Sequence, residues 1–244
     1  MTDPKAKLIV ALDVDTFEEA RRLVELLSPV VDIFKVGSQL FTACGPVAVR
    51  FIEAKGKEVF LDLKYHDIPN TVANAVRAAV TSLTAQRTNN KDNRSILMYT
   101  MHIVGGEEML KKAAEAARQA AQATGLRAPR ALGITVLTSE QATENTKKLV
   151  LERALLARKA GLDGVVASVE EAAMIRQELG SDFWIVTPGI RPASAAVGDQ
   201  KRVATPALAV KSGSNFLVVG RPIVEAEDPL KAAQAILQEI ERAS

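Results

Sequence analysis

Apolar and polar positions follow one another along the chain in a pattern that predicts strands and helices in regular succession. Short apolar runs, such as Leu8 to Leu12 and Phe216 to Val219, are typical of buried parallel strands. The longer segments between such runs carry apolar residues three and four positions apart, which is the spacing of one helix face. Thr16 and Glu19 have the spacing of a capping box at the start of the first such segment.

The whole pattern predicts eight strands, each followed by a helix. We expect strands at 8–12, 33–36, 59–63, 96–103, 131–136, 164–168, 183–186 and 216–219. We expect helices at 16–27, 39–54, 69–84, 107–123, 144–160, 169–179, 206–211 and 229–242. This alternation predicts an α/β fold with a parallel sheet, and the count favours a (β/α)8 TIM barrel. A doubly wound open sheet is the alternative, but no G-x-G-x-x-G turn follows the first strand.

No domain boundary is visible in the pattern, so residues 1–244 are expected to form a single domain. The most linker-like stretch, 86–93, falls between a helix and the next strand and is predicted to be a surface loop on the face away from the active site. The segment 191–200 follows the seventh strand and therefore belongs to the catalytic face. A mobile lid is one interpretation of that segment, and an ordinary loop is the other.

Composition excludes several classes of protein. The net charge of +2, from 31 Lys and Arg against 29 Asp and Glu, argues against electrostatic binding of nucleic acid. A single cysteine, Cys44, rules out an internal disulfide and fits a reducing compartment. No apolar run reaches the ~18 residues of a membrane span, and no signal peptide is recognised at the N-terminus. We therefore expect a cytoplasmic protein that binds neither nucleic acid nor membrane.

The most informative stretch is FLDLKYHDIPNTV at 60–72. Asp62 and Lys64 are two residues apart, so an extended backbone would point both to the same side of the sheet. Asp67 follows where the chain leaves the strand. Most charge clusters are merely solvated, but this Asp-x-Lys-x-x-Asp cluster lies at the carboxyl end of an apolar strand, where α/β proteins place their chemistry.

Two further charged residues, Asp13 and Lys35, lie near the carboxyl ends of the first and second predicted strands. If the first three strands are neighbours, these two side chains share one barrel mouth with Asp62 and Lys64. Buried ion pairs seldom offset their desolvation, so such an array is costly to assemble for stability alone. We interpret the four residues together as a functional site.

A phosphate site is predicted at the other end of the strand order. Gly220 and Arg221 follow the eighth strand, and Arg191 follows the seventh, with Gln200 further along the same loop. Barrels often bind phosphate with these two loops, where backbone N–H groups approach past a glycine and arginine binds the oxygens in a forked geometry. A phosphorylated ligand is the resulting hypothesis.

Four other reactive side chains are predicted to have no catalytic or metal-binding role. His66 and His102 lack a third ligand at a suitable spacing, so no metal site is predicted. Cys44 lies in a predicted helix without a nearby base and is interpreted as a packing residue. Tyr65 is expected to face the helix layer.

Seven motifs, in order along almost the full length, resemble those of the bacterial orotidine 5′-phosphate decarboxylases. They are ALDVD at 11–15, KVG at 35–37, DLKYHDIPNT at 62–71, VLTS at 136–139, TPGIR at 187–191, GDQKR at 198–202 and VVGRP at 218–222. The resemblance implies cofactor-free conversion of orotidine 5′-monophosphate to uridine 5′-monophosphate and CO2 in pyrimidine synthesis. Ile103 and Val104 are bulkier than the small residues that the family more often has after its fourth-strand histidine.

The resemblance also implies a role for each matched residue. Lys64 would donate a proton to C6 of the pyrimidine, Asp62 would lie beside the departing carboxylate, and Lys35 would join them in one charged array. A homodimer would share its active sites across the interface, with the second subunit supplying Asp67, Ile68 and Thr71. The remaining substrate contacts would be Asp13 to the ribose, Thr138 and Ser139 to the pyrimidine, and Arg191, Gln200, Gly220 and Arg221 to the phosphate.

Two rival functions remain open. Magnesium-dependent sugar-phosphate decarboxylases and hexulose-phosphate synthases use the same Asp-x-Lys-x-x-Asp cluster, but would be expected to lack the Ile-Pro-Asn-Thr continuation at 68–71. The other rival is a catalytically silent protein that binds nucleotide phosphates on the same scaffold. Sensitivity to a chelator distinguishes the first rival, and turnover distinguishes the second.

Overall fold

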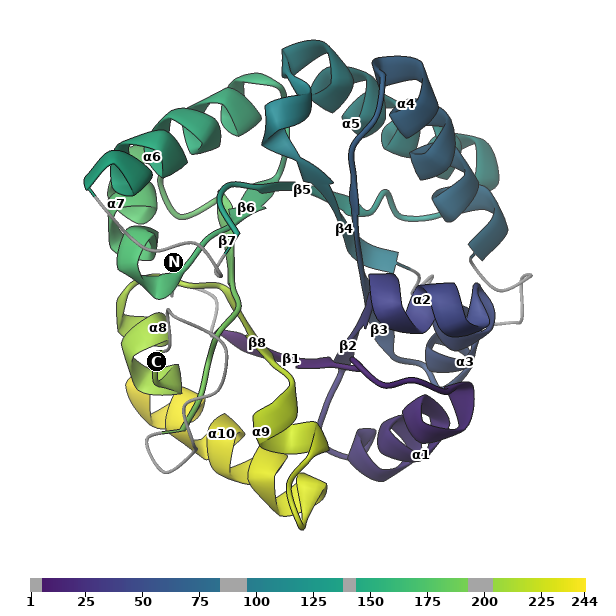
Figure 1. The fold of residues 1–244 in the computed structure, drawn as a ribbon, viewed down its shortest axis with the longest axis vertical. Helices are drawn as coiled ribbons and strands as arrows, with labels where there is room; N and C mark the ends of the chain where they lie inside the picture. Colours follow the sequence, from purple (N-terminus) through teal and green to yellow (C-terminus); the bar gives the residue numbers. More distant parts are fainter. Residues whose placement is uncertain (1–5, 84–95, 138–143, 193–203) are drawn as a thin grey trace.

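The computed structural model describes residues 6–83, 96–137, 144–192 and 204–244, and its strands form a closed parallel barrel in chain order. The last strand pairs with the first, so the sheet has no free edge. The ring is seen end-on in Figure 1. The strands are β1 (Lys7–Ala11), β2 (Ile33–Gly37), β3 (Glu58–Tyr65), β4 (Ile96–His102), β5 (Arg130–Ile134), β6 (Gly164–Val166), β7 (Trp184–Thr187) and β8 (Phe216–Val219). The predicted barrel is confirmed, and the open-sheet alternative is wrong.

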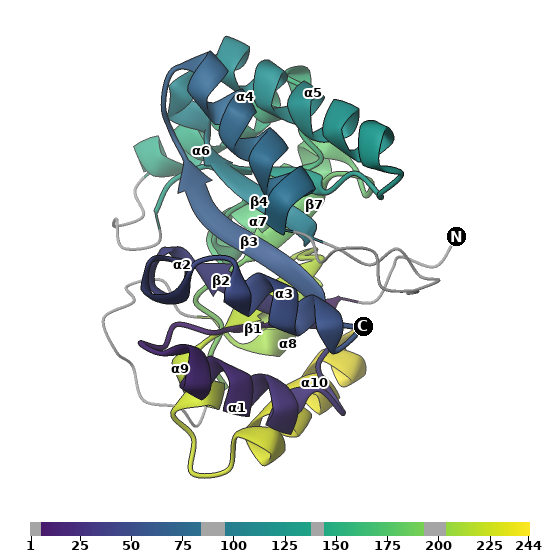
Figure 2. The same ribbon diagram turned by 90° about the vertical axis from the view of Figure 1, so that its right-hand side faces the viewer.

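Helices surround the barrel on all sides (Figures 1 and 2). They are α1 (Phe17–Leu27), α2 (Ser38–Cys44), α3 (Val47–Ala54), α4 (Pro69–Ala78), α5 (Glu107–Thr124), α6 (Glu144–Lys159), α7 (Val169–Leu179), α8 (Pro206–Lys211), α9 (Arg221–Val224) and α10 (Pro229–Ala243). A large apolar core fills the space between strands and helices, and a smaller one that includes Ile9, Phe60 and Leu132 fills the barrel. No helix of the described residues is long and apolar enough to cross a bilayer.

One helix prediction is wrong, because the segment 39–54 forms two helices. Gly45 ends α2 with φ +61, a conformation that favours glycine, and Pro46 then precedes α3. The periodic pattern continues across this break, which is why it suggested one helix. The predicted capping box of α1 is confirmed, with Thr16 and Glu19 each bonded to the backbone of the other.

Other differences are confined to the ends of elements and to short helices. The helix expected to end at residue 84 is α-helical only to Ala78 and continues as a π-helical turn, Ala79–Leu83. The pattern also missed α9 and the 3-10 turn Ile103–Gly105, because such short segments are not long enough to display a helical period. The remaining predicted elements are present with boundaries shifted by no more than two residues.

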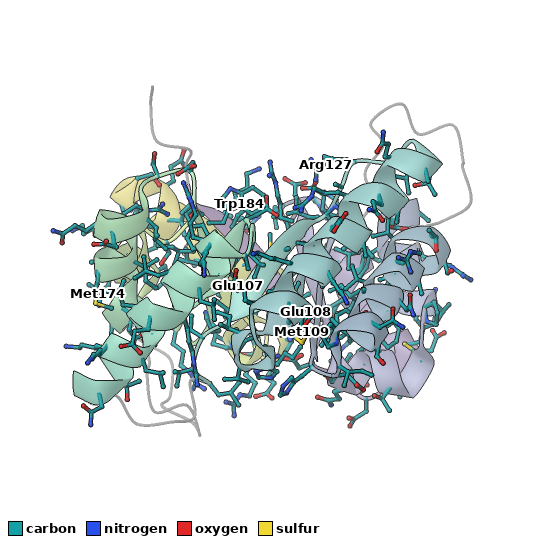
Figure 3. All side chains as sticks on the ribbon, turned by 90° about the horizontal axis from the view of Figure 1, so that it is seen from above. Glu107, Glu108, Met109, Arg127, Met174 and Trp184 are labelled. Atoms are coloured by element: carbon teal, nitrogen blue, oxygen red, sulfur yellow. The ribbon has the colours of Figure 1, made fainter. Side chains whose placement is uncertain are left out.

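The barrel end where the strands begin is filled by side chains. The rings of Trp184 and Phe216 lie 4.8 Å apart, and the guanidinium carbon of Arg130 lies 5.3 Å from the Trp184 ring. Arg130 is also paired with Asp163 at 2.6 Å. Figure 3 shows Trp184 along one edge of the molecule together with Arg127, which follows α5. A ligand is therefore expected at the opposite end, where the strands finish.

Candidate active site

A cavity of about 440 Å³ lies at the carboxyl ends of the strands. Its walls combine apolar strand residues with polar side chains from the loops that follow. The charged and amide side chains that line it are Asp13, Lys35, Gln39, Asp62, Lys64, Arg191, Arg221 and Glu225. A cavity of this size and lining is suited to a small anionic ligand.

Four of the predicted residues form a continuous chain of alternating charges in this cavity. Lys35 Nζ lies 2.7 Å from Asp13 Oδ1 and 3.8 Å from Asp62 Oδ2. Lys64 Nζ lies 2.7 Å from the same Asp62 oxygen. The register of the sheet explains the arrangement, since Ala11 pairs with Lys35 and Gly37 with Asp62. The structure thus brings together Asp13, Lys35, Asp62 and Lys64, as the sequence predicted.

The middle of this chain of charges is buried, and its two ends are more exposed, with the Asp13 side chain 48% exposed. The side chains of Lys35 and Asp62 are each only 10% exposed, whereas that of Lys64 is 35% exposed. Charges in this partly buried setting interact more strongly than at the surface, and removal of one partner leaves the other desolvated without compensation. The ammonium group of Lys64 is therefore held in place and still reaches the ligand space.

The expected extended conformation at Lys64 is wrong. Lys64 has φ +52, and it is the sole non-glycine residue with a positive φ in the part of the chain described. The pairing of β3 with β4 shifts register between Leu61 and Tyr65, which accompanies this distortion. Lys64 and Asp62 still line the same cavity, but the strand reaches it through a residue with positive φ, and not through simple alternation of side chains.

Thr100 is a site residue that sequence reasoning missed. It is fully buried on β4, its hydroxyl accepts a hydrogen bond from the backbone N–H of Lys64 at 2.9 Å, and it donates to Asp62 Oδ1 at 2.9 Å. A signal was available, because Thr100 lies two residues after Met98, which packs inside the barrel. A polar residue on that inward-facing register needs a polar partner.

Three of the four predicted phosphate residues, Arg191, Gly220 and Arg221, line the cavity. Gly220 precedes the first turn of α9, which begins at Arg221, and both residues line the cavity with Arg191. Arg191 is 7% exposed, and its backbone N–H donates to the carbonyl of Ala204 at 2.9 Å. Short extra helices after the eighth strand are a recurrent phosphate site in barrels of this type.

Three other predicted residues lie away from the cavity of their own chain. Asp67, Ile68 and Thr71 are exposed, and the cavity lining does not include them. Asp67 Oδ1 accepts a hydrogen bond from the N–H of Ile68 at 2.6 Å, and the Ile68 side chain is 67% exposed. Thr138, Ser139 and Gln200 lie outside the described residues, as do the loop 86–93 and residues 193–200 of the segment interpreted as a lid.

The four reactive side chains for which no catalytic or metal-binding role is predicted have these surroundings in the structure. Tyr65 packs against the core between barrel and helices, where burial raises its pKa to about 12. Cys44 ends α2 and donates to the carbonyl of Leu40. The rings of His66 and His102 lie 5.7 Å apart, and burial lowers the pKa of His102, with further lowering from His66 and Lys64. Within the described ranges, no group of three His, Cys, Asp or Glu side chains is placed to hold a metal ion.

The bulky residues after β4 are accommodated by a glycine on the next strand. Ile103 is buried, and a Cβ atom added to Gly133 would lie 2.6 Å from its Cδ1 atom. Val104 is 53% exposed. The larger side chains therefore leave the end of β4, and with it Thr100, in place.

Comparisons with known proteins show that the chain is similar to members of one family in both sequence and structure. Residues 6–236 match the sequence model of the family described as "Orotidine 5'-phosphate decarboxylase / HUMPS family". The chain is 49% identical to the orotidine 5′-phosphate decarboxylase of Geotalea daltonii, over 98% of this chain and 97% of the relative. It is 50% identical to that of Geobacter metallireducens, over 97% and 96%. The crystal structure of orotidine 5′-phosphate decarboxylase from Lactobacillus acidophilus superposes with a TM-score of 0.79 at 35% identity, covering 96% of this chain and 99% of that one.

Proposed function

Because this chain belongs to the orotidine 5′-phosphate decarboxylase / HUMPS family, we propose that it decarboxylates orotidine 5′-monophosphate to uridine 5′-monophosphate and CO2 in pyrimidine biosynthesis. The observation that carries the proposal is the chain of charges from Asp13 to Lys64, within a cavity that also contains Arg191 and Arg221. This arrangement offers an ammonium group for the reacting carbon and guanidinium groups for the phosphate.

The chemistry requires a fixed positive charge at the reacting carbon. When the bond between C6 and the carboxylate breaks, its electron pair stays on C6, where no adjacent carbonyl delocalises it. Lys64 Nζ, held 2.7 Å from Asp62, would stabilise this pair by charge and then transfer a proton to C6. The products are CO2, the neutral pyrimidine ring and a neutral Lys64 amine, which regains its proton from solvent.

The carboxylate of Asp62 has two parts in this proposal. It orients Lys64, and it faces the substrate carboxylate with like charge, a repulsion that is relieved as CO2 leaves. The second effect is a form of ground-state destabilisation. Lys35, 3.8 Å from Asp62 and 2.7 Å from Asp13, would keep the array together while Asp13 contacts ribose hydroxyls.

The proposal extends to the assembly and to the residues that match the family motifs. We propose a cytoplasmic homodimer of single-domain subunits, residues 1–244, in which Asp67, Ile68 and Thr71 reach the cavity of the neighbouring subunit. Their exposure and their absence from the cavity lining of their own chain support this arrangement. Thr138 and Ser139 would contact the pyrimidine, and Gln200 would join Arg191, Gly220 and Arg221 at the phosphate.

The test of the function is turnover in the presence of a chelator. Purified protein mixed with orotidine 5′-monophosphate and excess EDTA is expected to deplete the orotate absorbance at the same rate as without EDTA, because the proposed chemistry uses side chains alone. Activity that EDTA abolishes and Mg²⁺ restores would indicate the metal-dependent rival. Binding of the nucleotide without turnover would indicate the silent binding protein.

Replacing Arg221 with alanine is expected to raise KM by about 10- to 100-fold, with a smaller fall in kcat. The guanidinium would bind a phosphate remote from the reacting carbon, so its loss weakens capture of substrate more than the chemical step. Steady-state kinetics of Arg127→Ala provide the control, because Arg127 pairs with Glu58 at the start of β3, at the barrel end away from the cavity. An unchanged KM for Arg221→Ala would assign the phosphate to other groups.

A further inference from the structure

The hydroxyl of Thr100 is bonded to both ends of the Asp62–Leu63–Lys64 segment. It accepts from the Lys64 N–H and donates to Asp62 Oδ1, each at 2.9 Å. The other Asp62 oxygen, Oδ2, accepts from Lys64 Nζ at 2.7 Å. These three hydrogen bonds close a ring that passes through the backbone and the side chain of the same lysine.

The ring constrains two features that the strand alone would not maintain. A lysine with φ +52 is in a conformation that L-residues adopt at a cost, so it persists where surrounding contacts determine it. A carboxylate can also rotate about its bond to Cβ, which would turn its oxygens away from Lys64, and a hydrogen bond to one oxygen fixes the plane of the group. Because the single Thr100 proton is donated to Oδ1, Oδ2 is left for the two ammonium groups.

We propose that Thr100 is a positioning residue for Lys64 and Asp62, one that holds the left-handed backbone at Lys64 and sets the orientation of the Asp62 carboxylate. The consequence for catalysis rests on the proposed function, since it concerns the placement of the ammonium group at C6. A shift of about 1 Å at a reacting group is enough to lower a rate substantially. Thr100 itself touches no substrate in this proposal, because it does not line the cavity.

Two substitutions separate the hydroxyl of Thr100 from its volume. Thr100→Val keeps the shape and removes the hydroxyl, and we expect kcat to fall by about 10- to 100-fold with KM changed by less than about threefold. Thr100→Ser restores the hydroxyl, and we expect kcat within about threefold of the parent protein. If Thr100→Val does not fold, Thr100→Ala, which also lacks the hydroxyl and cannot clash, replaces it with the same expected loss.

A second measurement tests the geometry without relying on activity. Amide hydrogen exchange followed by NMR is expected to show a slow Lys64 N–H in the parent and in Thr100→Ser, and a faster one in Thr100→Val and Thr100→Ala. The Ile185 N–H, bonded to Asn215 Oδ1 at 2.8 Å, is the control and should be unchanged in every variant. If the parent protein did not turn over orotidine 5′-monophosphate, the proposed function would be wrong. The exchange rate of the Lys64 amide would still decide whether Thr100 holds the backbone at Lys64.

Two results would overturn the proposal. One is a hydroxyl-free variant that keeps both the parent kcat and the slow Lys64 amide. The other is a folded Thr100→Ser that loses as much activity as Thr100→Val, since packing alone would then explain the effect.

Discussion

Replacing Lys64 with alanine is expected to lower kcat/KM for orotidine 5′-monophosphate by at least about 10⁴-fold, because one group supplies both the charge and the proton. Proton transfer from a positioned acid and stabilisation of developing charge each contribute about 10²-fold or more. Asp62 would lose its partner at 2.7 Å and keep Lys35 at 3.8 Å, so the remaining array would face the substrate with a net negative charge. Decay of the orotate absorbance at saturating and limiting substrate measures both kinetic constants.

Lys57→Ala is a matched control for that experiment. Lys57 is also a lysine paired with an aspartate, at 2.9 Å from Asp32, but it lies just before β3, at the barrel end away from the cavity. Its loss is expected to leave kcat/KM within about twofold of the parent, because neither residue of the pair lines the cavity and the side chain of its Asp32 partner is 74% exposed. If Lys64→Ala retained activity close to that of Lys57→Ala, another group would have to donate the proton.

Mixing two inactive variants, Lys64→Ala and Asp67→Ala, is expected to restore about a quarter of the parent activity after subunit exchange. Random exchange makes about half of the dimers mixed, and one of the two sites in each mixed dimer draws an intact Lys64 from one chain and an intact Asp67 from the other. The exposed position of Asp67, outside the cavity lining of its own chain, is the structural basis of this expectation. Activity is measured as exchange proceeds, and native mass spectrometry reports the mixed dimers.

A mixture of Lys64→Ala with Asp62→Ala is the control for complementation. Asp62 and Lys64 of one chain share a cavity and lie 2.7 Å apart, so every mixed site lacks one of them and no activity should return. If mixed dimers form from Lys64→Ala and Asp67→Ala and the activity stays at background, Asp67 acts within its own chain. The proposal of an active site shared between subunits is then wrong.

The sequence alone determined the fold class, most of the element order and the residues of the charged array. Apolar periodicity predicted every strand of the barrel, because the buried face of a strand or helix repeats at a spacing visible in a short window. Asp13, Lys35, Asp62 and Lys64 could be grouped in advance, because parallel neighbouring strands bring their carboxyl ends to one face. Motif resemblance then added a substrate that periodicity alone could not indicate.

Tertiary structure decided the features that depend on register between strands. Thr100 lies 38 residues from Asp62, and their contact follows from the pairing of β4 with a distorted end of β3. The left-handed Lys64 could not be read from its own residue type, since lysine disfavours that conformation and only its surroundings maintain it. The helix break at Gly45 was likewise hidden by a periodicity that continues across it. Local patterns in a sequence record which face of an element is buried, whereas the conformation of a strained residue is settled by contacts with groups far away along the chain.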